Sequence, residues 1–248
     1  MYFQRADVRA LVFQSPQPRK ALFVGGNPRK YFELINNMKN DNLSVDRILE
    51  QKIDKQKSTL SSTFDKNFDV QEKTLSIIVD SLKYSIENKH STVEMIYNIS
   101  GFVNLISYDL KIISRDLTFS KKQWQKRLYA RQAYLTIYES MDDLLELCGK
   151  KLRNEINTLK DSEDLLTRLK DVIGKLNIFK SEHQSTLSDI RHNAIGHREH
   201  DMLKQLNYIS SINWIDSISL ISEYDRIVSE LGSVCQILIN RSIDEVHR

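Results

Sequence analysis

The chain has 248 residues, of which 40% are hydrophobic and 28% charged. This balance suits amphipathic helices with hydrated outer faces better than a thick buried sheet. The net charge of +3 is unevenly spread, because residues 1–30 hold six basic residues and one acidic residue, a net charge of +5, which leaves −2 for residues 31–248. Because residues 31–248 are so close to neutral, the sequence argues against broad, charge-driven binding of nucleic acid. A small local binding site remains compatible with this charge.

The two cysteines and the apolar runs indicate a cytoplasmic protein without a membrane anchor. Cys148 and Cys235 both fall in apolar helical patterns and are too few for a disulfide framework or a cysteine-rich zinc site, so we expect buried free thiols. No apolar run approaches the roughly 18 residues that a membrane span needs. Arg5, Asp7 and Arg9 interrupt any apolar core of a signal peptide.

The distribution of proline divides the chain. All three prolines lie within the first 28 residues, whereas the rest has no proline and only five glycines. We therefore predict an irregular basic arm over residues 1–30, weakly β at residues 21–24, followed by almost uninterrupted helix. A soft boundary separates an N-terminal helical region at 31–119 from a helical bundle at 120–248.

The N-terminal region predicts three helices. A polar helix extends from Leu43 to about Phe64, and a second covers residues 75–86. Residues 91–94, Ser-Thr-Val-Glu, form a capping box that opens a third helix. Apolar side chains recur along it every three or four residues as far as Leu117.

The next region predicts long helices separated by one break. A helix after Ser120 has an apolar stripe that reaches Ile156. A break near residues 160–162 is followed by a helix with apolar residues as far as Leu176. A capping box at residues 181–184, Ser-Glu-His-Gln, opens another helix.

A polar connection over about residues 198–213 precedes the last predicted helix. Two series of apolar residues recur in that helix at intervals of seven, as in the seam of a helical bundle. The two series are Trp214, Ile221, Val228 and Cys235, and Tyr224, Leu231 and Leu238. The fold class that follows is all-α.

One arginine and one histidine stand out at the end of a helical pattern. Arg191 and His197 lie in the segment Ser-Asp-Ile-Arg-His-Asn-Ala-Ile-Gly-His-Arg, residues 188–198. Arginine is a permanent cation whose fork of donors matches a phosphate. Histidine is the side chain best suited to moving protons near neutral pH. Together the two are able to bind and cleave a phosphodiester without a metal.

A helical wheel places both residues on the packed side of their helix. With Leu187 at 0°, Arg191 falls at about 40° and His197 at about 280°, so about 120° separates them. One straight helix is therefore a poor active site. A break at Gly196, a second copy of the chain, or both would bring the two side chains together. The alternative is structural: Arg191 is an ion-pair partner, for example of a buried carboxylate, and His197 is a cation at the C-terminal cap of the helix.

Other chemistries have weaker support. A zinc site from His192, His197 and His200 fails because their spacing does not put all three on one helical face and no cysteine lies nearby. No nucleophile elbow, Walker A motif or dinucleotide fingerprint is present. We therefore predict neither a metal nor a cofactor.

The segment Ile-Arg-His-Asn-Ala-Ile-Gly-His, residues 190–197, resembles the signature of the HEPN superfamily. That signature is an arginine, then four to six residues of which the first is usually polar, then a histidine. HEPN domains are all-α bundles, usually dimeric, and many are metal-independent endoribonucleases of toxin–antitoxin, abortive-infection and CRISPR systems. The resemblance covers residues 121–248, and residues 1–118 contribute nothing to it.

The resemblance implies a HEPN-like four-helix bundle with an additional N-terminal helical region. It implies a homodimeric endoribonuclease of a prokaryotic defence or toxin–antitoxin system, with Arg191 and His197 catalytic and RNA as substrate. His192 and Asn193 would orient the scissile phosphate or the motif itself. An antitoxin or other defence-system protein is a further expected partner. Some HEPN domains have lost activity, so the alternative is a non-catalytic interaction or regulatory module.

Overall fold

The computed structural model describes residues 42–159, 162–196 and 201–246, and helices form nearly all of this part. No strand occurs within these ranges, which confirms the all-α prediction for them. The predicted arm at residues 1–30 lies outside them. None of the helices in these ranges is both long enough and apolar enough to cross a membrane.

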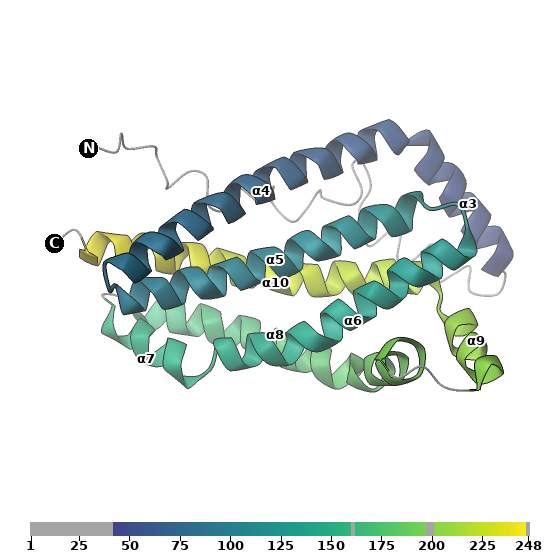
Figure 1. Ribbon diagram of the computed structural model, residues 1–248. Helices are drawn as coiled ribbons and strands as arrows, with labels where there is room; N and C mark the ends of the chain where they lie inside the picture. The colour runs from purple at the N-terminus through teal and green to yellow at the C-terminus, as the bar shows by residue number, and fades with distance from the viewer. Residues whose placement is uncertain (1–41, 160–161, 197–200, 247–248) are drawn as a thin grey trace.

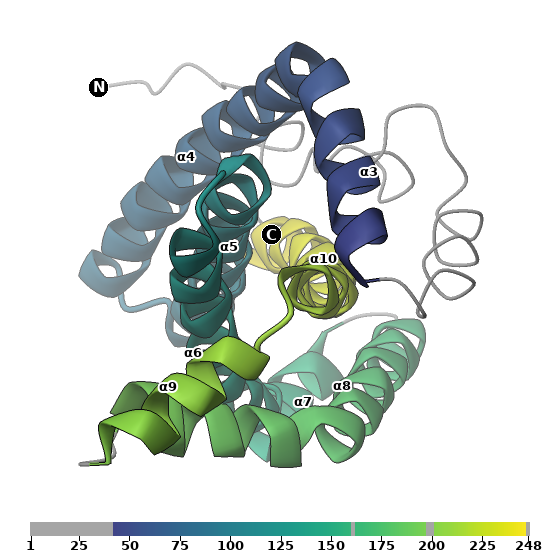
Figure 2. The ribbon, with the colours of Figure 1, turned by 90° about the vertical axis from the view of Figure 1, so that its right-hand side faces the viewer.

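Four long helices pack around one another. They are α5 (Ser91–Phe119), α6 (Gln123–Leu147), α8 (Ser162–Ile190) and α10 (Trp214–Val246). Successive members run in alternating directions (Figure 1). Figure 2, which looks along the bundle, shows α10 at its centre, and α10 packs against α5, α6 and α8. Each helix buries an apolar stripe against two or more neighbours, as helical bundles require.

The remaining elements surround these four. α4 packs along the outer side of α5, and α3 turns away from the start of α4 (Figure 1). A short helix, α7, follows α6, and the segment η1 and the helix α9 connect α8 to α10. The bounds are α3 (Asn42–Lys55), α4 (Lys57–Glu87), α7 (Lys150–Thr158), η1 (Arg191–Gly196) and α9 (Met202–Ser211).

α3 is attached to the start of α6 through a buried lysine. Lys126 Nζ lies 2.5 Å from Glu50 Oε1 and 3.6 Å from the centroid of the Trp214 ring. The Lys126 side chain is 1% exposed, so its charge requires both partners.

A single cluster of buried side chains extends from Ile78 on α4 to Ile239 on α10. It includes residues on both sides of the boundary predicted at residue 119. α5 precedes that boundary and is nevertheless one of the four helices that share the core. That residues 120–248 fold independently stays a prediction.

The seam predicted for the last helix is confirmed. All seven of its members are at most 3% exposed in α10, namely Trp214, Ile221, Tyr224, Val228, Leu231, Cys235 and Leu238. Both cysteines are free and buried, as predicted. Burial raises the pKa of the Cys148 thiol and of the Cys235 thiol to about 12.

The predicted division between the first two helices is wrong. The chain bends at Gln56, and α4 is continuous from Lys57 to Glu87. No glycine or proline lies in that stretch to stop the helix. Phe64 and Phe68 are buried and contact aromatic rings of α5. Tertiary packing therefore supports helix through residues 65–74, which the sequence pattern assigned to neither helix.

The two predicted capping boxes have different outcomes. α5 begins at Ser91, but its cap is His90, which makes no side-chain capping hydrogen bond. α8 passes through Ser181 without interruption, so the predicted helix start there is wrong. Ser181 Oγ instead donates to the carbonyl oxygen of Ile178 (2.7 Å). This bond within the helix satisfies the hydroxyl, so Ser181 does not need to cap a helix end.

Two further boundaries differ from the prediction. The helix expected to reach Ile156 ends at Leu147, and α7 begins at Lys150. The connection predicted as polar over residues 198–213 contains α9, whose first turn is capped by Asp201. The Asp201 carboxylate accepts hydrogen bonds from two backbone N–H groups, which is what an N-cap provides.

Candidate functional site

The arginine–histidine segment begins where α8 changes its helical geometry. α8 is α-helical to Ile190, and residues Arg191–Gly196 form the π-helix η1. Arg191 is therefore the first residue of η1 and Gly196 the last. π-helical turns are rare and are frequent at functional sites. The helical geometry therefore changes at Arg191, whereas the break predicted at Gly196 concerns the path to His197, which lies outside the described residues.

Arg191 turns toward α6, as the helical wheel predicts. Its Nε donates a hydrogen bond to Glu139 Oε1 (2.6 Å), and its Cζ lies 5.2 Å from the centroid of the Tyr138 ring. The hydrogen bond with Glu139 raises the pKa of Arg191 above its already high value. The guanidinium is thus a fixed cation at the junction of α8 and α6.

The ion pair with Glu139 bears on the structural alternative. That alternative makes Arg191 a structural ion-pair partner, and the ion pair is present, although the Glu139 side chain is 51% exposed and not buried. The Arg191 side chain is 31% exposed, so solvent and a solute anion reach the pair. The bond to Glu139 uses one of the five N–H donors of the guanidinium. Surface pairs of this kind contribute little to stability.

Two polar contacts hold the backbone of η1 in place. Asn193 Nδ2 donates to the carbonyl oxygen of Asp189 (2.8 Å), and Arg131 Nη1 on α6 donates to the carbonyl oxygen of Ala194 (3.1 Å). Ala194 itself is buried. Each of the two side chains thus adds a directional contact to a carbonyl oxygen at or beside η1. The predicted orienting role of Asn193 stays a prediction.

The other predicted site residues have different outcomes. His192 is exposed on η1. His197 and His200 lie outside the described residues. The structure therefore brings together Arg191, Asn193 and the α6 side chains of Arg131, Tyr138 and Glu139. The α6 contributions carry no local sequence signal, because they follow from packing between segments about 60 residues apart.

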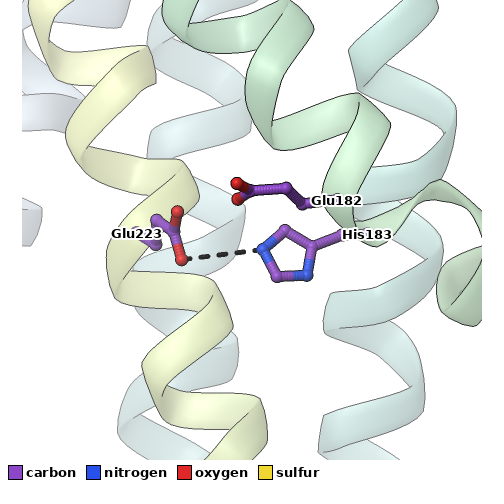
Figure 3. A group of neighbouring side chains, drawn as sticks. All are labelled: Glu182, His183 and Glu223. Atoms are coloured by element: carbon purple, nitrogen blue, oxygen red, sulfur yellow. Dashed lines mark ion pairs between the residues drawn. The ribbon is translucent and has the colours of Figure 1, made fainter.

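A second group of side chains was not anticipated from the sequence. Glu182 and His183 on α8 face Glu223 on α10 (Figure 3), and one potential ligand atom of each lies within 4.8 Å of those of the other two. The adjacent Glu–His pair was visible in the sequence, but Glu223 lies 40 residues later. Only the packing of α8 on α10 joins them.

Compared with protein-family models, with curated proteins and with solved structures, the chain gives no significant match.

Proposed function

We propose that the chain is a metal-independent endoribonuclease of HEPN type that acts in a prokaryotic defence or toxin–antitoxin system. The observation that carries the proposal is the position of Arg191. A permanent cation stands at the first residue of a π-helical turn, held by α6 and open to solvent. A fixed, accessible guanidinium of this kind suits a phosphate.

The reaction follows from the two side chains of the motif. An RNA 2′-hydroxyl loses its proton to a general base and its oxygen forms a bond to the adjacent phosphorus. His197 is this base, or the acid that protonates the leaving oxygen. The bond from phosphorus to the 5′-oxygen breaks, and that oxygen takes up a proton. The products are a 2′,3′-cyclic phosphate and a 5′-hydroxyl. Arg191 stabilises the charge that develops on the phosphate oxygens.

Glu139 has a defined place in this scheme. In the free protein it holds the guanidinium of Arg191 in one orientation through Nε. An incoming phosphate competes with Glu139 or uses the outer Nη donors, so substrate binding works against one local negative charge. Glu139 therefore orients the guanidinium of Arg191 before RNA binds, but its negative charge weakens the attraction between Arg191 and RNA.

A homodimer completes the proposed site. The wheel separates Arg191 and His197 by about 120° on a straight helix, and η1 departs from a straight α-helix at Arg191. A second copy related by a twofold axis would place two such pairs in one cleft. Size-exclusion chromatography with light scattering on the full chain measures whether it is dimeric.

The decisive test is RNA cleavage in EDTA by the wild type and by Arg191→Ala and His197→Ala. We expect each variant to lose at least about 100-fold in rate, since general acid–base catalysis contributes 10²–10⁴-fold. Mass spectrometry of the products should find 2′,3′-cyclic phosphate ends.

Arg168→Ala is the matched control. Arg168 is exposed on the same helix, about 35 Å from Arg191 along its axis. We expect it to cleave like the wild type. Equal rates in the wild type, Arg191→Ala and His197→Ala would refute the nuclease proposal.

A non-catalytic interaction module is the second candidate, and two observations favour it. Arg191 already has an anionic partner in Glu139. α9 exposes three apolar side chains close together on one face, Met202, Leu203 and Leu206. Exposed apolar side chains grouped in this way suit a protein partner. Induced expression separates the candidates: growth arrest relieved by His197→Ala indicates the nuclease, whereas a chain inert on RNA that retains a partner through α9 indicates the module.

A further inference from the structure

We propose that Glu182, His183 and Glu223 form a binding site for a divalent transition-metal ion, Zn²⁺ first among them, between α8 and α10. The three residues contribute two carboxylates and one imidazole, whose ligand atoms lie within 4.8 Å of one another. This inference is independent of the proposed nuclease, which uses other residues and no metal.

The distance between two of the ligand atoms fits a shared ion. His183 Nε2 lies 3.7 Å from Glu223 Oε2, which is too long for a hydrogen bond. Zinc binds nitrogen and oxygen at 2.0–2.2 Å, so two ligand atoms on one tetrahedral zinc stand about 3.4 Å apart. This pair needs only a small adjustment to reach that spacing, and the remaining ligand atom of Glu182, within 4.8 Å of the other two, would move closer by up to about 1.4 Å (Figure 3).

The imidazole nitrogen that faces the group has no other use. His183 Nε2 is shielded from solvent and has no hydrogen-bond partner among the described residues. The ring of His183 packs on Phe179, with 4.5 Å between ring centroids, so neighbouring packing limits its movement. A shielded nitrogen without a hydrogen-bond partner among these residues, beside two carboxylates, is available as a metal ligand.

The charges of the group suit a divalent cation. Glu182 is exposed and Glu223 is 40% exposed, so both carboxylates are accessible to an ion from solvent, and both face the group that contains His183 Nε2. A divalent ion offsets both charges and satisfies the nitrogen at the same time. Two carboxylates and one imidazole suit Zn²⁺ and its first-row neighbours, whereas Mg²⁺ prefers oxygen ligands alone. Three protein ligands leave a fourth tetrahedral position to water.

The location gives the ion a structural consequence. α8 reaches η1 eight residues after His183, about two helical turns. A metal bound to Glu182, His183 and Glu223 would link this last part of α8 directly to α10. The expected result is a more stable chain in the presence of the ion, because a ligand that binds only the folded state stabilises it.

The test is calorimetric titration of the EDTA-treated full chain with ZnCl₂ in a buffer that does not bind metals. We expect one ion per chain in the wild type. His183→Ala and Glu223→Gln should weaken binding by at least about 10- to 100-fold, since even second-shell changes cost that much. Glu223→Gln keeps the shape of the side chain, so circular dichroism should show an intact fold and lost binding reflects the lost ligand.

His90→Ala is the matched control, because His90 lies at the start of α5 and outside the group. It should bind Zn²⁺ like the wild type. Cobalt substitution gives a second readout: the visible spectrum should show nitrogen and oxygen coordination without a thiolate band. Two results overturn the proposal, namely no binding of Zn²⁺ below millimolar concentration, or equal binding by the wild type, His183→Ala and Glu223→Gln. Neither result bears on cleavage by Arg191 and His197 in EDTA.

Discussion

The seam of α10 and the segment η1 differ in what holds them in place. The seam consists of apolar side chains that are almost wholly buried, such as Val228 and Leu231. η1 buries Ala194 but is otherwise fixed by side-chain hydrogen bonds from Arg131 and Asn193 and by the ion pair of Arg191. Area removed from water stabilises the first, and a few directional contacts stabilise the second.

The difference separates stability from function within one bundle. Removing apolar area from the seam should lower the stability of the whole chain, because the seam belongs to the single core. Breaking a polar contact at η1 should open that segment locally and leave the core intact. The proposed phosphate site would gain from that separation, since its geometry could change without unfolding the bundle.

Leu231→Ala should have the largest effect. Leu231 is 1% exposed in the seam, and removal of its side chain leaves a cavity. We expect the free energy of unfolding to fall by about 2–5 kcal/mol in urea titrations. Leu206→Ala is the matched control, because Leu206 is 37% exposed on α9 and should change stability by less than about 0.5 kcal/mol. Equal losses in the two variants would show that the seam is not the main source of stability.

The second prediction concerns the thiols of the core at alkaline pH. Burial raises the pKa of Cys148 and of Cys235 from 9.0 to about 12, so the folded chain holds both protons more tightly than the unfolded chain. The two thiols do not change the free energy of unfolding below pH 9. As pH rises from 9 to 12, the unfolded chain loses these protons first, and the free energy of unfolding falls by up to about 1.4 kcal/mol per thiol per pH unit.

The measurement is urea unfolding of the wild type and of Cys148→Ala/Cys235→Ala across pH 8–11. Burial also raises the pKa of Tyr224, so the variant should keep part of the slope and lose the share of the thiols. A slope unchanged by the double substitution would contradict the burial of the two thiols.

Periodic apolar patterns in the sequence predicted the seam well. Tyr224 and Cys235 recur with their neighbours at intervals of seven, and both are buried in α10. The local capping signal at Ser181 failed, because a hydroxyl within a helix bonds to the carbonyl oxygen of Ile178 equally well. The bend at Gln56 has no sequence signal, since nothing in that residue stops a helix.

The sequence predicted only those residues of the candidate site that lie within the motif itself. The wheel anticipated that Arg191 faces a neighbouring helix, and it does. Glu139 and Arg131 were not anticipated, because only the packing of α6 beside η1 brings them to the motif. The same reason explains why Glu223 was missed as the partner of His183. Sequence periodicity tells which face of a helix is buried and leaves open which residue it meets.

Arg131→Met tests whether η1 opens by itself. The substitution keeps most of the side-chain volume and removes the donor to the carbonyl oxygen of Ala194. A charge-assisted hydrogen bond is worth about 1.5–3 kcal/mol, so amide exchange over residues 191–196 should quicken by a factor of about 10 or more. The melting temperature should change little. Arg168→Met is the control, because Arg168 is exposed on α8 and far from η1. Loss of exchange protection throughout the chain in Arg131→Met would show that η1 and the core unfold together.

Asn193→Ala should have the smallest effect, and it separates two roles for that residue. The Asn193 amide donates to the carbonyl oxygen of Asp189, a neutral hydrogen bond worth about 0.5–1.5 kcal/mol. If this bond is its whole role, amide exchange in η1 rises by less than about 15-fold and RNA cleavage falls by no more than a similar factor.

If Asn193 also contacts the scissile phosphate, cleavage should fall far more than exchange rises. Asn193→Asp adds a sharp comparison, because it removes the donor while keeping the shape and introduces a negative charge near Arg191. A positioning role through the backbone predicts that exchange rises at least as much in Asn193→Asp as in Asn193→Ala, because the Asp carboxylate also repels the carbonyl oxygen of Asp189. A direct phosphate contact predicts that cleavage falls by more than exchange rises in Asn193→Ala, where no charge is introduced.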